Sequence, residues 1–459
     1  MRIIIFSALS VLLCANPLPV LALTDQDARE LVEEVRSLRR AVEDQNRRIE
    51  ELEAKVAAGE PSGTEAPTPE SLGDAGPAAS TPSTPSAGSV VGARQAAQPQ
   101  IGVVFDGTYT AGKNVADEAQ LRAIELNVGA PIDPYFDLFG KLVFSADNSA
   151  ASPPEAAVEN AYITAHLPLN LEARFGLEWI PFGDVGTLDI DEHPQVDQPH
   201  AIAQFLGGEG LKAIGGHVEW LAPFAANPTL SLTIGAYNRA TGDANTTASD
   251  KDGDGAPDAP DMFLDEGAFN VRDRERGPLW FGRAASYYEW DAGHHAIRVG
   301  GSYLSDENDA SGATRTSVAG LDAKYRWRPD ATGRGITFAG EYLHHRRQES
   351  PTTLFLANGG NDLSNGGGYV YGQYDFDKRW GLGYRYDNTN TAFSAASEIA
   401  AHSVYGEYRP TEFSRLRAQY RHDDRNFDAT ANGLRTDDDA DVFLLQFTHF
   451  IGWHPAHKF

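Results

Sequence analysis

Hydrophobic and polar residues alternate one by one in many short segments of residues 101–459. Around Leu321, for example, Leu321 and Tyr325 occupy one set of alternate positions, whereas Asp322 and Lys324 occupy the other. Successive side chains of a β-strand point to opposite faces of the sheet. Each of these segments therefore predicts a strand with one apolar face and one polar face.

The apolar faces admit two interpretations. If they met a packed core, the polar faces would meet bulk water, as in a β-sandwich or a propeller. If they met lipid, the polar faces would line a water-filled lumen. The pattern recurs in about sixteen segments, an even number within the range of outer-membrane barrels. Aromatic residues also gather at segment ends, as a membrane-interface girdle requires. These residues are Trp179, Trp220, Trp290, Tyr325, Trp327 and Tyr420.

The joints between the segments alternate between short and long. Residues 131–134 and 329–333 are short joints, whereas residues 184–209, 241–276 and 348–366 are long. Transmembrane barrels have short periplasmic turns and longer outer loops, which predicts such an alternation. We therefore expect an all-β fold, an antiparallel transmembrane barrel of about 16 strands.

Three segments with other patterns precede the predicted barrel. Residues 1–22 have Arg2, an apolar stretch and a terminal Ala22, which predicts a secretory signal peptide. A lipoprotein anchored through Cys14 is a weaker interpretation, because a bulky residue precedes this cysteine. Residues 58–100 are rich in Pro, Ser and Ala without apolar periodicity, which predicts a disordered linker.

Residues 23–57 carry a heptad repeat, which predicts a short α-helical coiled coil in the periplasm. The apolar residues of the repeat are Leu31, Val35, Leu38, Val42, Ile49, Leu52 and Val56. Burying this seam requires partner helices from other copies of the chain. The alternative is a solvated charged helix that stays single.

Composition narrows the class of protein further. The chain has 459 residues and a formal net charge of -27, which argues against nucleic acid as a partner. Its single cysteine, Cys14, lies in the predicted signal peptide, so the mature chain would have no thiol chemistry. No G-x-S-x-G or H-E-x-x-H motif occurs, and we therefore predict no enzyme.

The long joint at residues 184–209 is acidic and contains histidines, and we expect it to narrow the pore. The candidate constriction residues in this loop are Asp189, Asp191, Glu192, His193, Asp197 and His200. Polar positions on the flanking strands add Arg174, Glu178 and Glu219. Carboxylate with imidazole also suits zinc. The competing interpretation is a folded loop whose acids and histidines only bond to their neighbours.

A second acidic stretch has the pattern of a calcium-binding loop. Aspartate alternates with other residues and is followed by glycine, as in the first half of an EF-hand loop. The candidate ligands are Asp250, Asp252, Asp254, Asp258 and Asp261. A bound Ca²⁺ would order an outer loop. The alternative is a solvated acidic loop without an ion.

Several motifs resemble a family of outer-membrane proteins labelled zinc-regulated TonB-dependent outer-membrane receptors, which is similar to the phosphate-selective porins O and P. The motifs are PYFDLFGKLVF at 134–144, ENAYIT at 159–164, EWIPFG at 178–183, HPQVDQPHAI at 193–202, FLGGEGL at 205–211 and VEWLAP at 218–223. The resemblance implies a sixteen-stranded barrel that forms trimers, with an N-terminal coiled coil in the periplasm.

Together these features predict a porin in the outer membrane of a Gram-negative bacterium, through which small hydrophilic solutes or ions diffuse passively. The terminal Phe459 is the usual recognition signal for the barrel assembly machinery. Outer-membrane lipid, lipopolysaccharide and two further copies of the chain are the other expected partners. Two alternatives remain at this point. One is a receptor for a divalent metal such as zinc, and the other is a structural protein that tethers the envelope.

Overall fold

The computed structural model describes residues 99–453, except for 116, 147–154, 187, 190, 209, 224–226, 239–277, 308–313, 330–331, 349–361, 393 and 428–438. The chain divides into two units, Met1–Pro85 and Ser86–Phe459, and the barrel belongs to the second unit. The predicted signal peptide and coiled coil, nearly all of the linker, the calcium loop and the terminal Phe459 lie outside the described residues and stay predictions.

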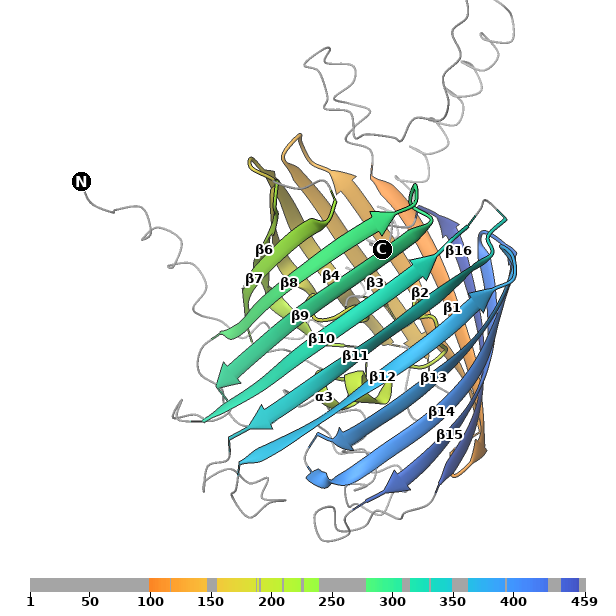
Figure 1. The fold of residues 1–459 in the computed structure, drawn as a ribbon. Coiled ribbons are helices and arrows are strands. Elements are labelled where there is room, and N and C mark those ends of the chain that lie inside the picture. The colour runs from red at the N-terminus through yellow and green to blue at the C-terminus, as the bar shows by residue number, and fades with distance from the viewer. Residues whose placement is uncertain are drawn as a thin grey trace, which may run out of the picture. The chain divides into compact units, whose positions relative to one another are not determined.

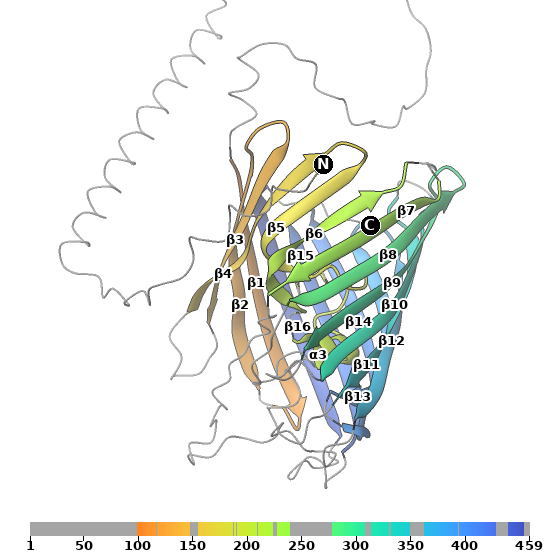
Figure 2. The same ribbon diagram turned by 90° about the vertical axis from the view of Figure 1, so that its left-hand side faces the viewer.

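Sixteen strands form one closed antiparallel barrel, which confirms the predicted fold class (Figures 1 and 2). The first eight strands are β1 (Gln100–Lys113), β2 (Glu118–Pro131), β3 (Phe136–Ala146), β4 (Glu155–Leu167), β5 (Leu171–Trp179), β6 (Lys212–Leu221), β7 (Thr229–Tyr237) and β8 (Leu279–Trp290). The last eight are β9 (His295–Glu307), β10 (Arg315–Trp327), β11 (Gly335–Arg347), β12 (Leu363–Asp375), β13 (Trp380–Thr391), β14 (Ser394–Thr411), β15 (Ser414–Asn426) and β16 (Ala440–Gly452).

Each strand pairs with its neighbours in sequence, and β1 pairs with β16 to close the ring. In the closing pair, Phe105 lies opposite His449 and Thr110 lies opposite Leu444. Closure leaves no free strand edge, so every strand shares backbone hydrogen bonds on both sides. A structure of this kind satisfies its backbone polar groups without help from water.

The predicted alternation matches the two faces of the barrel wall. On β10, Leu321 is 69% exposed on the outer surface, whereas the adjacent Asp322 is 5% exposed and points inward. Likewise, Leu416 on β15 is 43% exposed, whereas Arg417 is 2% exposed. The outer surface therefore carries large apolar side chains around the ring, far more than the isolated patches that water-exposed surfaces show.

Connections after even-numbered strands are short, and most connections after odd-numbered strands are longer, as the sequence predicts. Aromatic side chains gather at the short-turn end. There, Trp380 stacks on Tyr408 with ring centroids 4.3 Å apart. Trp290 stacks on His295 at 5.0 Å and on Tyr325 at 6.2 Å. This arrangement is typical of an interfacial aromatic girdle.

Among the described residues, one helix, α3 (His200–Leu206), interrupts the all-strand pattern, and it lies inside the ring of strands (Figures 1 and 2). It belongs to the long connection between β5 and β6. Among the helices of the described residues, none is long and apolar enough to cross a membrane.

Replacing Leu321 by arginine tests whether the outer surface meets lipid. The residue sits at the middle of β10, where an arginine facing lipid destabilises a barrel by about 2–4 kcal/mol. We expect Leu321→Arg to lower the free energy of unfolding by that amount in reversible denaturant titrations from lipid vesicles. The conservative control Leu321→Phe should retain wild-type stability. Equal stability of the arginine variant and the wild type would mean that this surface meets water.

Candidate functional site: a loop folded into the barrel lumen

Residues 180–211 leave the wall after β5, cross the lumen and return to it at β6. The backbone N–H of Ile180 donates a hydrogen bond to the carbonyl oxygen of Leu211 at 2.8 Å, which closes the neck of the loop. Beyond this neck, the loop bonds to side chains from strands on several sides of the lumen. These contacts decide which part of the lumen stays open.

Glu341 on β11 holds the first turn of the loop. Its Oε1 accepts hydrogen bonds from the backbone N–H groups of Asp184 at 3.0 Å and Val185 at 2.8 Å, and from the Tyr369 hydroxyl at 2.8 Å. Gly183 precedes this contact with φ of 69°, and a Cβ there would meet the Glu341 carboxylate. Both its left-handed backbone and this close approach require glycine.

The carboxylate of Asp184 is also fixed by the wall. It forms ion pairs with Arg298 of β9 and with Lys324 of β10, the latter at 3.4 Å. These two groups come from strands four and five places along the ring from β5. The first turn of the loop is therefore tied to a distant part of the wall and not only to its own neighbours.

Arg417 on β15 holds the middle of the loop through backbone carbonyl groups. Its guanidinium donates to the carbonyl oxygens of Asp191 at 2.8 Å and Gln195 at 2.7 Å, and also to that of His193. The neighbouring Gln419 accepts a hydrogen bond from the backbone N–H of Val196 at 2.9 Å. A planar guanidinium presents several donors in a fixed fork, so one side chain satisfies three loop carbonyls.

Asp197 ties the next segment to β13 and β15. Its carboxylate pairs with Arg385 at 3.0 Å and with Arg421, and it accepts a hydrogen bond from Gln419 Nε2 at 2.6 Å. Burial alone would raise the pKa of Asp197, but the positive charges of Arg385 and Arg421 outweigh it. They hold the pKa of this carboxyl well below its usual range, so it stays ionised.

The helix α3 fills one side of the lumen with apolar side chains. It packs on β11, β12 and β13, and Ile202 and Phe205 are completely buried. The buried cluster includes inward-facing apolar residues of the wall, among them Leu343 and Val318. This part of the lumen is a hydrophobic core, and it corrects our expectation of a polar lumen throughout. Strict alternation fails here because the wall is covered by protein on its inner face as well.

A polar cavity of about 400 Å³ remains on the other side, between the first half of the loop and the wall from β3 to β9. Five carboxylates and four lysine or arginine side chains line it. The carboxylates are Glu178, Asp184, Asp189, Glu192 and Glu219, and the cations are Lys141, Arg174, Arg283 and Arg298. The Arg174 guanidinium lies over the ring of Tyr162, 4.4 Å from the centroid of that ring. The lining is therefore charged, mixed in sign and weakly acidic in total.

Five of the nine predicted constriction residues line this cavity. They are Asp189, Glu192, Arg174, Glu178 and Glu219. The other four, Asp191, His193, Asp197 and His200, belong to the loop but are packed toward the wall and do not line the cavity. The distinction follows from the ties described above, which turn alternate parts of the loop toward or away from the open side.

The two loop histidines do not come together around one site. His193 is buried with its Nε2 3.3 Å from the carbonyl oxygen of Leu188, and burial followed by the Arg417 charge lowers its pKa to about 3. The Nε2 of His200 is 3.3 Å from Asp423 Oδ1 on β15. Within the part of the chain that the structure describes, the residues grouped closely enough to share a metal ion are acidic and include no histidine.

Two residues of the site escaped the sequence argument. Trp179 has the parity of a lipid-facing residue, yet its ring lies 5.2 Å from the Lys141 ammonium and 5.5 Å from that of Lys212. It lines the cavity because β5 ends there and the chain turns inward. It is therefore not part of the predicted girdle. The sequence argument missed Glu159 because this residue is the extra residue of a β-bulge. On β3, Lys141 pairs with Asn160 and the next residue, Leu142, pairs with Val158, so Glu159 has no partner in the register.

No protein-family model matches the chain. Over 361 residues, the chain is 30% identical to a protein of Aquifex aeolicus (strain VF5) described as uncharacterized. The match covers 74% of this chain and 70% of that protein, and the chain belongs to the same family as the Aquifex protein.

Several solved structures with a similar fold are outer-membrane proteins. OmpT of Vibrio cholerae in its trimer form is 11% identical, with a TM-score of 0.48 and coverage of 78% of this chain and 100% of that chain. The outer-membrane channel DcaP of Acinetobacter baumannii is 11% identical, with a TM-score of 0.48 and coverage of 77% and 96%. The anion-selective porin from Comamonas acidovorans is 9% identical, with a TM-score of 0.47 and coverage of 77% and 100%. These likenesses concern the fold alone.

Removing the guanidinium of Arg417 should loosen the loop. Arg417→Met leaves three buried loop carbonyls without a donor, and each unsatisfied group costs about 1–3 kcal/mol. With Cys14 replaced by serine, a single cysteine at Ala201 in the buried face of α3 reports opening through its maleimide labelling rate. We expect that rate to rise about tenfold or more.

The matched control is Arg346→Met, which removes an arginine of β11 whose side chain is 60% exposed and pairs with Asp362, outside the loop. It should leave the labelling rate unchanged. An equal rate in the Arg417 variant would show that this residue does not hold the loop in place.

Proposed function

We propose that the protein is an outer-membrane porin through which small hydrophilic solutes or ions diffuse passively. The observation that carries this proposal is the combination of a closed barrel with an apolar outer surface and a charged cavity beside an inward-folded loop. A closed barrel with alternating faces is one of the few structures that satisfy a backbone within lipid. The cavity is lined by charges of both signs, and hydrated ions and polar solutes can interact with these charges.

The cavity lining favours a weak preference for cations. Its carboxylates exceed its lysines and arginines by one, and both signs are present along the path. Opposite charges that lie close together compensate each other. The charge selectivity therefore depends on the excess of one carboxylate and is small. The lining offers no continuous ladder of positive charge for anions such as phosphate.

Further parts of the proposal rest on the sequence. We propose that the chain forms a trimer, with residues 23–57 joining copies in the periplasm and residues 58–100 acting as a tether. The supporting features are the unbroken heptads and the linker composition. We also propose that the chain is related to the phosphate-selective porins O and P. A further proposal is that residues 250–261 bind Ca²⁺. The separation of His193 from His200 offers no support for a zinc receptor.

Planar lipid bilayers test the pore directly. Addition of the purified protein should produce discrete conductance steps, because a water-filled path crosses each barrel. In a gradient of KCl, the reversal potential should show a weak preference for K⁺. Protein that is folded, as judged by heat-dependent mobility on gels, but that produces no steps would overturn the proposal.

Two substitutions in the cavity should shift selectivity in opposite directions. Glu219→Gln removes a negative charge and should move the reversal potential toward anions by several millivolts, whereas Arg174→Gln should move it toward cations. The control is Glu398→Gln, which removes an exposed carboxylate of β14 that does not line the cavity. Shifts of the same size in the control would mean that the ions do not pass through this cavity.

A further inference from the structure

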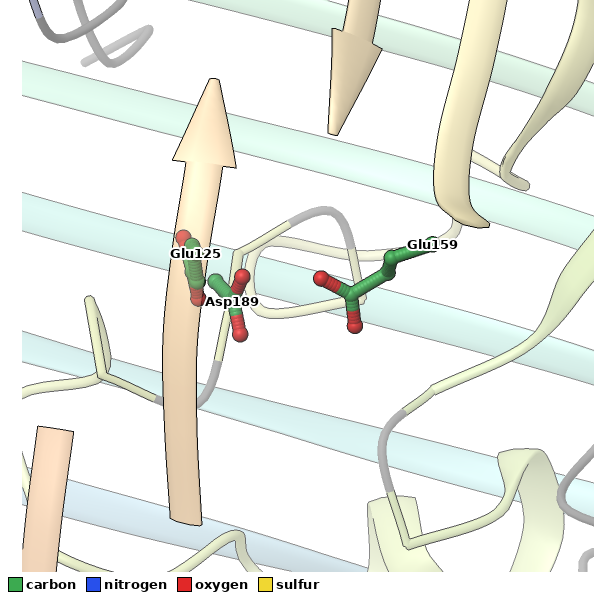
Figure 3. Close-up of side chains that lie close together, drawn as sticks. All are labelled: Glu125, Glu159 and Asp189. Carbon is green, nitrogen blue, oxygen red and sulfur yellow. The ribbon is translucent and has the colours of Figure 1, made fainter. Parts of the chain in front are cut away.

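Three acidic side chains from different parts of the chain point into one small space (Figure 3). Glu125 comes from β2, Glu159 from β4 and Asp189 from the inward-folded loop. One carboxylate oxygen from each lies within 4.8 Å of those of the other two. This spacing allows three oxygens to contact the same ion.

The backbone sets up this convergence. Glu125 faces inward on β2 and is 3% exposed, and the bulge in β4 turns Glu159 into the lumen beside it. The ties of the loop to Glu341 on β11 and Arg417 on β15 bring Asp189 to the same place. The group therefore exists only in the folded barrel with the loop inside it.

Lysine supplies part of the opposing charge. The ammonium of Lys141 is 3.1 Å from Glu125 and 3.4 Å from Glu159, and it also pairs with Asp189. A second ammonium, that of Lys212, is 3.3 Å from Glu159. Three carboxylates thus share two positive charges.

A fourth carboxylate adjoins the group. Asp191 is 1% exposed, and neither of its carboxylate oxygens has a hydrogen-bond partner. It follows Asp189 by two residues in the loop, and the charges of Asp189 and Lys141 are among those that act on it. A buried carboxylate without a partner is unfavourable unless a cation compensates it. Glu192 and Arg415 also act on Asp191, one with each sign of charge.

We propose that Glu125, Glu159 and Asp189, with the unpartnered Asp191 beside them in the chain, form a binding site for a hard divalent cation of the Ca²⁺ or Mg²⁺ class at the pore constriction. A ligand set made only of carboxylate oxygens suits these ions, whereas zinc and copper favour sites with nitrogen or sulfur. A divalent ion would add positive charge to a group in which three carboxylates share two ammonium groups. The Trp179 ring, 5.2 Å from the Lys141 ammonium, gives that ammonium a favourable position when the ion takes the carboxylates.

The bound ion would join the loop to the part of the wall where the Lys141 ammonium now pairs with Asp189. Asp189 and Asp191 belong to the loop, whereas Glu125 and Glu159 belong to the wall. The ion would also reduce the negative charge at the edge of the cavity. Binding does not depend on the proposed pore function, whereas an effect of the ion on conductance rests on it.

Calorimetry with the full chain tests the binding. The protein carries Asp250→Asn, Asp252→Asn and Asp254→Asn, so that the acidic stretch at 250–261 does not contribute, and it is treated with EDTA before titration with CaCl₂ or MgCl₂. We expect saturable binding that weakens at least about tenfold in Asp189→Asn/Asp191→Asn. The control pair Glu398→Gln/Asp424→Asn removes two exposed acids outside the site and should bind as before. Absence of binding, or equal binding in all three proteins, overturns the proposal.

A second variant gives a result that loss of the fold would not produce. Lys141→Met removes the ammonium that competes for the same carboxylates, so the divalent ion should bind about tenfold more tightly. Heat-dependent mobility on gels confirms that the barrel is folded. Unchanged or weaker affinity in this variant contradicts a shared site. Because calorimetry detects binding and bilayers detect conductance, the two proposals fail independently.

Discussion

The pairing of β1 with β16 is the constraint on which the rest of the structure depends. Once the sheet closes, the backbone groups of every strand are satisfied within the wall, and the side chains alone decide what each face meets. Leu321 and Leu416 then point outward, and Asp322 and Arg417 point inward. The inward polar groups need partners of their own, because they are shielded from bulk water by the loop. Arg417 finds them in the loop, whereas Asp322 pairs with Arg283 of the neighbouring wall at 2.7 Å.

The contacts of the loop with the wall are mostly charged or involve backbone groups. Glu341 accepts from two backbone N–H groups, Arg417 donates to three carbonyls, and Asp197 pairs with two arginines. Such bonds are directional, and breaking one leaves a buried group unsatisfied. They fix the position of the loop more narrowly than apolar packing would. The apolar side of α3 then fills the remaining space on β11 to β13.

This division of the lumen also decides where polar space remains inside the barrel. One side is a hydrophobic core that includes Phe205 and Leu343, and it leaves no polar path. The other side, between β3 and β9, keeps a cavity whose lining carries charges of both signs. The acidic group around Asp189 stands at the edge of this cavity, where the loop meets β2 and β4. An ion bound there would act on loop position and on local charge together.

The sequence by itself determined the barrel, the number of strands and the polarity of each face, because the two-residue period of a strand is a local property. It also located the loop that enters the lumen. Only the tertiary structure decided which loop residues line the cavity, because their partners are distant in the chain: Arg417 binds the carbonyl of Asp191 across 226 residues. Trp179 and Glu159 depart from the period for the same reason, since the end of a strand and a bulge redirect them. Alternation specifies a face, whereas the choice between lipid, core and cavity depends on what the folded chain places against it.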